Sequence, residues 1–366
     1  MKKIPIYQPG LHGNEKKYVL DCLDSNWISS KGKYVRQFEE SIENYVGGVF
    51  ATSCSNGTVA LHLALLALDI GPGDEVIVPA FTYIASVNAI RYVGAEPVFV
   101  DSDPSTWNVT VGLIDDAITA KTKAIMCVHI YGVPGDVDPI IRLARGKNLK
   151  VIEDCAEALG SVYKGRHVGV SSDIATFSFF GNKTITTGEG GMVFSQHEEL
   201  IRKVAHLKNQ AVSNTIDYWH DCVGYNYRLT NIASAIGLAQ LERVEEILGA
   251  KRRLADSYRR HLEPLGVRFQ EVSNDDVSSC WLNVVQLPSH SHANSAKDRL
   301  TQAGIEVRPA FPLVSEMPPY KNINSKEFPH AKNISQTAIC LPSFPDLSSE
   351  DVDYICRSIS DGINSD

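Results

Sequence analysis

One lysine of the chain stands in a setting that could give its amine a chemical role. Lys183 follows the aromatic strand pattern Thr176–Phe180 and precedes the glycine-rich turn Gly188–Gly191, after which a second apolar run begins. This order predicts a loop at the edge of a sheet, with aromatic and backbone groups around the amine. Burial there would lower the pKa of the lysine and make it nucleophilic. Most lysines in loops are simply solvated. Whether Lys183 is reactive or solvated must therefore be judged from the neighbouring segments.

A carboxylate is expected near this amine. Asp154 ends the apolar run that begins at Val151, and open α/β sheets bind ligands at the carboxyl ends of their strands. An aspartate at such a position also often caps the next helix. Pyridine chemistry needs an acid at this place, because an anion beside the ring nitrogen keeps that nitrogen protonated and lets the ring accept electrons.

Two further segments could hold other parts of a ligand. Ser53–Thr58 follows a short strand pattern and opens a helix, so its backbone N–H groups could bind an anion, although a plain capping turn explains the same residues. Tyr83 follows the next strand and could cover a flat ring. Packing in the core is the competing interpretation for Tyr83.

The elements around these residues follow an α/β pattern. From residue 48 onward, short β-branched runs alternate with longer amphipathic ones, which is typical of a mainly parallel sheet covered by helices. The predicted strands are 76–78, 97–100, 124–128 and 151–152, and the predicted helices are 57–69, 83–93 and 137–147.

The second part of the chain predicts a smaller unit. A helical pattern from Thr230 to His261 predicts one long helix that links two domains, and beyond it we expect a strand at 280–286 and helices at 295–303 and 348–363. We therefore predict a large domain at 1–245 and a smaller α+β domain at 246–366. The first 45 residues or so, with two amphipathic segments, could pack on the small domain or on a partner chain.

Charge and hydropathy exclude several classes of protein. The formal net charge of -8 is spread among interspersed acidic and basic residues, so we expect no nucleic-acid partner. No apolar run approaches the ~20 residues of a membrane span, and the first residues do not resemble a signal peptide. We expect a cytoplasmic protein without a membrane anchor.

Cysteine and histidine spacing gives no metal motif. The eight cysteines are scattered without a Cys-x-x-Cys pair, which favours buried thiols over disulfides or zinc ligands. His290 and His292 are predicted to lie in an exposed loop, and the other histidines lack metal-ligand spacing. We assign no metal site.

Two nucleotide-binding motifs are also excluded. A P-loop has glycine directly before its lysine, whereas Asn182 precedes Lys183. The cluster Gly188–Gly191 lacks the Gly-x-Gly-x-x-Gly spacing and precedes a strand rather than a helix. A nucleotide-dependent oxidoreductase is therefore not supported.

Four segments together resemble the DegT/DnrJ/EryC1/StrS family of sugar aminotransferases, and the resemblance covers nearly the whole chain. They are Ser53–Thr58, Glu153–Glu157, Phe177–Gly191 and Gly224–Asn231. The resemblance implies the type I fold of pyridoxal-phosphate-dependent transferases, similar to aspartate aminotransferase, with a mainly parallel seven-stranded sheet in the large domain. It also implies a homodimer with shared active sites, and leaves open whether dimers pair into tetramers.

The resemblance also assigns roles to individual residues. Lys183 would form the Schiff base with pyridoxal 5′-phosphate, and Asp154 would pair with the pyridine nitrogen. The other cofactor contacts that it implies are Glu157 near the ring oxygen, Tyr83 on the ring, Gly57, Thr58 and Ser178 at the phosphate, and Asn226 at the phosphate of the other subunit.

The implied reaction moves an amino group from L-glutamate to a nucleotide-linked keto sugar. Three segments resemble the family members that aminate GDP-4-keto-6-deoxy-D-mannose at C4 to GDP-perosamine for O-antigen synthesis: Phe179–Gly191, Trp27–Gly32 and Tyr218–His220. A UDP- or dTDP-linked keto sugar remains an alternative, as does a regulatory protein that binds the cofactor without catalysis. One branch of the family has histidine in place of the lysine and removes a hydroxyl group, so Lys183 favours amination.

The chain departs from its relatives in loops on the substrate side. Ser315 stands where close relatives usually carry a histidine, and Lys208–Ala211 lacks a glycine that is usual there. Arg308 precedes the altered stretch 310–316 and is predicted to contact the diphosphate, since a guanidinium matches phosphate oxygens; a surface salt bridge is the alternative. These differences leave the identity of the sugar open.

Overall fold

The central element of the computed structural model, which describes residues 3–323 and 326–363, is a seven-stranded sheet. Its order is β1-β9-β8-β5-β4-β2-β3, and β9 alone runs antiparallel to its neighbours. The strands are β1 Phe50–Cys54, β2 Glu75–Pro79, β3 Glu96–Val100, β4 Thr122–Val128, β5 Lys150–Asp154, β8 Ile174–Ser178 and β9 Gly191–Ser195. The predicted mainly parallel sheet is confirmed.

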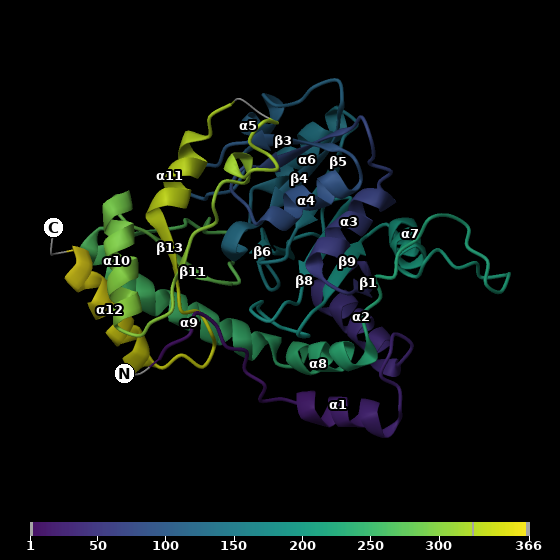
Figure 1. Ribbon diagram of the computed structural model, residues 1–366, viewed down its shortest axis with the longest axis horizontal. Coiled ribbons are helices and arrows are strands. Elements are labelled where there is room, and N and C mark those ends of the chain that lie inside the picture. The colour runs from purple at the N-terminus through teal and green to yellow at the C-terminus, as the bar shows by residue number, and fades with distance from the viewer. Residues whose placement is uncertain (1–2, 324–325, 364–366) are drawn as a thin grey trace.

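Helices cover both faces of this sheet (Figure 1). They include α2 Lys33–Val46, α3 Gly57–Ala67, α4 Ile84–Tyr92, α5 Val111–Asp115, α6 Val137–Gly146 and α7 Glu198–Lys208. Successive side chains of each strand point to opposite faces. In β2, Val76 and Val78 join the core cluster that contains α3 and α4, whereas Ile77 joins the cluster that contains α2 and α6. The strands are therefore apolar on both sides, which explains their uninterrupted apolar runs.

A second, four-stranded sheet lies beyond this core. It has the order β10-β11-β13-β12 and is antiparallel throughout. Its elements are β10 Arg268–Phe269, β11 Asn283–Gln286, β12 Arg308–Pro309 and β13 Ala338–Leu341, with α10 His290–Gln302, α11 Pro329–Thr337 and α12 Ser349–Ile363. This is the expected smaller α+β unit, while the exact division at residue 245 stays a prediction.

The predicted single helix from Thr230 to His261 is wrong. The structure has two helices, α8 Asn231–Leu241 and α9 Val244–Leu262, separated at Glu242 and Arg243. Arg243 has non-helical dihedral angles, and the Glu242 carboxylate accepts hydrogen bonds from Tyr18 Oη (2.6 Å) and Asn14 Nδ2 (2.7 Å). Because these partners are distant in sequence, the apolar periodicity alone could not reveal the break.

The expected exposed loop at His290 and His292 is also wrong, because both residues lie in the first turn of α10. Ser289 caps this helix, its Oγ accepting a hydrogen bond from the His292 N–H at 3.3 Å. A serine directly before an amphipathic pattern is a recognisable start signal for a helix.

The N-terminal segment contacts both units. Helices α1 Glu15–Asp24 and α2 pack on α8, where Asn231 accepts from the Tyr34 N–H (2.9 Å) and donates to Trp27 O (2.6 Å). Before them, Ile4 forms a parallel bridge with Ile305 of the smaller unit. The segment thus ties the two units together within one chain.

The remaining elements are short: the hairpin β6 Val162–Tyr163 and β7 Arg166–His167, and the turns η1 Ile130–Gly132, η2 Glu263–Leu265 and η3 Val314–Glu316. All eight cysteines are free and six of them are buried, as expected.

Among the described residues, none of the helices has both the length and the apolar character needed to cross a membrane.

His167 predicts a pH dependence of stability. The Gly160 N–H donates to Nε2 (2.9 Å) and Nδ1 donates to Val168 O (2.7 Å), so the partly buried ring is neutral, and its loss of hydration lowers its pKa to about 4. The unfolded chain binds this proton near pH 6.5, so the stabilising contribution is present above that pH and is lost as pH falls towards 4.

Between pH 6.5 and 4, the free energy of unfolding of the wild type should fall by about 3 kcal/mol more than that of His167→Gln, which lacks the titrating ring. The measurement is urea unfolding at several pH values, with the exposed His197→Gln as control. Identical pH slopes in wild type and His167→Gln would contradict the assignment.

Candidate active site

A cavity of about 570 Å³ opens at the carboxyl edge of the large sheet. Seven of the residues predicted from the sequence line it, namely Gly57, Thr58, Tyr83, Asp154, Glu157, Ser178 and Lys183. Asp154 ends β5 in the middle of the sheet, and Lys183 lies on the connection between β8 and β9. Parallel strands bring these separate segments to one edge, which explains why they meet.

Asp154 is buried, and each of its carboxylate oxygens accepts a hydrogen bond. Its Oδ2 accepts from Ser86 Oγ (2.8 Å) and its Oδ1 accepts from the Ala156 N–H (3.0 Å). Burial raises the pKa of this carboxyl, while these two donors and Lys183 oppose the shift. Sequence reasoning missed Ser86, although a buried serine within the apolar helix α4 is a signal that could have pointed to it.

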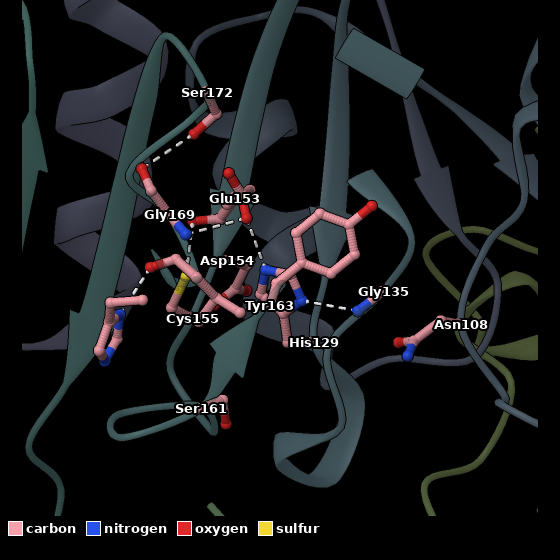
Figure 2. A network of polar contacts seen from close by, with 12 residues as sticks. Asn108, His129, Gly135, Glu153, Asp154, Cys155, Ser161, Tyr163, Gly169 and Ser172 are labelled. Carbon is pink, nitrogen blue, oxygen red and sulfur yellow. Dashed lines mark hydrogen bonds and ion pairs between the residues drawn. The ribbon is translucent and has the colours of Figure 1, made fainter. Parts of the chain in front are cut away.

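A second network of hydrogen bonds surrounds Glu153, the residue before Asp154 on β5 (Figure 2). His129 Nδ1 accepts from the Gly135 N–H (3.0 Å), so Nε2 carries the proton and donates to Glu153 Oε2 (2.8 Å). The Gly169 N–H donates to the same oxygen at 2.9 Å. Burial raises the pKa of Glu153, but the donors outweigh it and hold that pKa below its usual value.

This network fixes the backbone of β5 at the site, because the His129 N–H also donates to Asp154 O at 3.2 Å. The potential ligand atoms of His129, Glu153 and Cys155 lie within 4.8 Å of one another, a spacing that a metal ion could use. Both ring nitrogens of His129 already take part in hydrogen bonds, so the group acts as a hydrogen-bonded support.

Lys183 and Glu157 influence each other inside the cavity. Burial lowers the pKa of Lys183, and the charges of Glu157 and Asp154 oppose that shift. Burial raises the pKa of Glu157, whose Oε2 accepts from the Tyr131 N–H at 2.6 Å. A lysine in this environment gives up its proton more readily than a solvated one, as a nucleophilic amine must.

Aromatic residues form the walls of the cavity. Tyr83 is half exposed, and its ring centroid lies 5.6 Å from that of Phe311. Trp281 also lines the cavity, with the Lys183 amine 3.8 Å from its ring centroid. Sequence reasoning missed Trp281 and Phe311, which come from the smaller unit. Phe311 lies in the stretch singled out as altered, but no motif marks Trp281.

The N-terminus of α3 leaves backbone N–H groups open at one corner of the cavity. Asn56 caps the helix through a 3.0 Å bond from the Val59 N–H, so the capping interpretation is correct, but the N–H groups of Gly57 and Thr58 precede the first intrahelical bonds. A Cβ on Gly57 would lie 2.7 Å from Ser178 Cβ. The glycine therefore lets Ser178 approach the positive end of the helix dipole.

Two predicted residues lie outside the cavity. Asn226 is exposed, and its side-chain oxygen accepts from Arg228 at 2.8 Å. Arg308 on β12 is exposed and pairs with Glu306. Neither belongs to the cavity lining of a single chain.

The sequence model of the DegT/DnrJ/EryC1/StrS aminotransferase family matches residues 9–360. The chain belongs to this family. It is 52% identical to the GDP-perosamine synthase of Escherichia coli O157:H7, with 99% of each chain covered, and 46% identical to that of Vibrio cholerae, again with 99% of each covered. The putative sugar aminotransferase Spr1654 of Streptococcus pneumoniae superimposes with a TM-score of 0.95 at 29% identity, over 99% of this chain and 98% of that one.

The family members are pyridoxal-phosphate-dependent aminotransferases, and so is this chain. The cavity fits the cofactor chemically: it contains an amine that can react with an aldehyde, a carboxylate, aromatic walls and an open helix N-terminus. The close approach of Gly57 to Ser178, which a Cβ would block, brings the Ser178 side chain to that terminus, an arrangement that suits a phosphate.

We expect Gly57→Ala to weaken cofactor binding by roughly 10- to 100-fold, because displacing Ser178 would remove a hydrogen bond to a charged group. The Kd is measured by titrating the cofactor-free chain with pyridoxal phosphate and following the absorbance. Gly146→Ala, where nothing lies within 4 Å of the new Cβ, is the matched control. An unchanged Kd in a folded Gly57→Ala protein would exclude this corner as the phosphate site.

Proposed function

We propose that this enzyme transfers the amino group of L-glutamate to C4 of GDP-4-keto-6-deoxy-D-mannose and so makes GDP-perosamine. The observation that carries the proposal is the meeting of Lys183 and Asp154 in one buried cavity, in a chain 52% identical over its length to a GDP-perosamine synthase. The product would serve O-antigen synthesis, and the enzyme would work in the cytoplasm.

Different residues of the cavity have different roles in the reaction. When bound, pyridoxal phosphate supplies an electron-accepting ring that stabilises the carbon from which a proton is removed. Asp154 would hold the proton on the pyridine nitrogen, and Ser86 and Ala156 keep its carboxylate oriented. Thr58 and Ser178 would bind the phosphate, Glu157 would lie near the ring oxygen and Tyr83 would cover the ring.

The amine of Lys183 moves the proton. It takes one from Cα of glutamate in the first half of the reaction and delivers one to C4 of the sugar in the second. Its lowered pKa suits both tasks, because a base and an acid must each exchange protons near neutral pH. Positioned proton transfer of this kind contributes roughly 10²–10⁴ in rate.

Arg308 is our proposed contact to the diphosphate of the substrate. Its side chain is 65% exposed, and the short link to Glu306 leaves the guanidinium at the surface. Surface ion pairs of this kind contribute about 0–1 kcal/mol, so Arg308 could exchange Glu306 for a phosphate at little cost. Ser315 stands where the resemblance leads us to expect a histidine, and we expect the substrate class to survive this change.

The decisive experiment compares GDP-, UDP- and dTDP-linked 4-keto-6-deoxy sugars with glutamate as donor. We expect the highest kcat/KM with the GDP sugar, no turnover by Lys183→Ala, and a higher KM with nearly unchanged kcat in Arg308→Ala. Preference for a UDP or dTDP sugar would refute the perosamine assignment but leave the aminotransferase intact. Turnover by Lys183→Ala at the wild-type rate would exclude that residue.

We further propose a homodimer in which Asn226 reaches the phosphate of the partner's cofactor. The loop after α7 extends away from the body of the chain (Figure 1) and exposes four large apolar side chains, Ile216, Tyr218, Trp219 and Val223. Exposed apolar clusters usually mark an interaction surface. An Asn226 that lies outside its own chain's cavity is consistent with a role across the interface.

Complementation tests this arrangement. Lys183→Ala and Asn226→Asp chains, each inactive alone, should regain part of the activity when they are refolded together, because a hybrid dimer has one site with both residues intact. Hybrids are verified by tags on the two chains. The shared site would be contradicted by full activity in a strictly monomeric fraction. It would also be contradicted if verified hybrids of two inactive parent chains regained no activity.

A further inference from the structure

Two aromatic side chains from outside the large sheet hold the backbone on which Lys183 lies. Trp281, just before β11, donates its Nε1–H to Asn182 O at 2.7 Å. Tyr7, in the N-terminal segment, donates its hydroxyl to Lys183 O at 2.6 Å. Successive carbonyl groups of the loop are thus fixed by two separate parts of the chain.

Trp281 also contacts the lysine side chain itself. The Lys183 amine lies 3.8 Å from the centroid of the Trp281 ring, within the range of a cation–π contact. In the part of the chain that the structure describes, no hydrogen bond or ion pair involves this amine. The indole face is therefore the contact that places it.

The indole is itself held rigidly. Trp281 is buried and stacks on Tyr131 with ring centroids 6.1 Å apart and an angle of 15° between the planes. Tyr131 stacks in turn on Phe311 at 5.1 Å, and its hydroxyl accepts from the Phe311 N–H at 3.0 Å. Its backbone N–H holds Glu157. Through Tyr131, the stack fixes the position of the indole relative to Phe311 in the cavity wall and to Glu157.

Tyr7 is supported from a different direction. The amine of Lys251, a buried lysine on α9, lies 5.1 Å from the Tyr7 ring centroid and donates to Ser343 O at 2.7 Å. Tyr7→Phe would remove the hydroxyl bond to the loop while keeping the ring that covers Lys251.

We propose that Trp281 is a positioning residue for Lys183, and that the amine rests on the indole face whenever it is not bonded to the cofactor. The inference rests on the proposed function, which requires the amine to leave the cofactor, remain nearby as base and acid, and return. A cation–π contact suits this task, because it holds the amine in place without occupying it with a strong acceptor. Tyr7 limits the movement of the loop during the exchange.

Nuclear magnetic resonance tests the resting place without any turnover. The lysines of the full chain without cofactor are reductively methylated with ¹³C-formaldehyde, and the Lys183 signal is assigned by its absence in Lys183→Arg. Because methyl groups above an aromatic face are shielded, we expect this signal upfield of the other lysine signals in wild type. It should move to the range of the other lysines in Trp281→Leu and remain upfield in Tyr7→Phe.

A Lys183 signal among those of the exposed lysines in wild type would overturn the proposal, as would an upfield signal that survives in Trp281→Leu. Phe99→Leu is the matched control, since Phe99 is equally buried, does not line the cavity and has ring contacts with Tyr320 and Phe328 rather than with Tyr131. If Trp281→Leu fails to fold, Trp281→Phe keeps a ring face but removes the bond to Asn182 O. Its signal should stay upfield by a smaller amount, and an unshifted wild-type signal remains the refuting result.

The kinetic consequence is measured with cofactor bound, in the half-reaction with glutamate. We expect Trp281→Leu to lower the rate by roughly 10- to 100-fold, within the range that proton transfer contributes. The isotope effect with α-deuterated glutamate should increase, while KM changes little and Phe99→Leu behaves as wild type. An unchanged rate and isotope effect would refute the positioning role. Loss of activity towards the GDP sugar alone would refute the substrate assignment without affecting this result.

Discussion

The structure depends on the burial of three carboxyl groups at the end of one strand. Glu153, Asp154 and Glu157 are each at most 5% exposed, and removing a carboxylate from water costs several kcal/mol unless donors replace the lost hydration. The donors come from different parts of the chain: His129 after β4, Ser86 on α4, Gly169 before β8 and the Tyr131 backbone. The parallel sheet makes this convergence possible, because strands that run in one direction end at one edge.

The same burial creates the reactive environment of Lys183. A cavity that excludes water disfavours both the ammonium and the carboxylates, so the pKa of Lys183 falls while those of Asp154 and Glu157 rise. Glu153 does not line the cavity, and the donors at its Oε2 hold its pKa below the usual value. The pKa values of these adjacent residues thus shift in opposite directions, because the two side chains face opposite sides of the sheet.

The smaller unit completes this environment. Trp281 and Phe311 close the cavity opposite the sheet, and Trp281 fixes the lysine loop through Asn182. Gln270 reaches across to Thr106 O (2.6 Å) and Ile130 O (3.2 Å), and Tyr131 takes the left-handed conformation (φ 53°) between Trp281 and Phe311. A strained backbone at such a position persists only where surrounding contacts hold it. The complete site therefore requires that the two units are packed together.

The sequence by itself determined the alternating elements, the edge at which Lys183 and Asp154 meet and the family, because these depend on local periodicity and on short motifs. Only the tertiary structure decided the break between α8 and α9, the support of Asp154 by Ser86 and His129, and the aromatic wall of Trp281. Each of these depends on partners far apart in sequence; Trp281 and Asn182 are 99 residues apart. Such contacts have no period and no motif, so they become visible only when the sheet and the smaller unit are packed together.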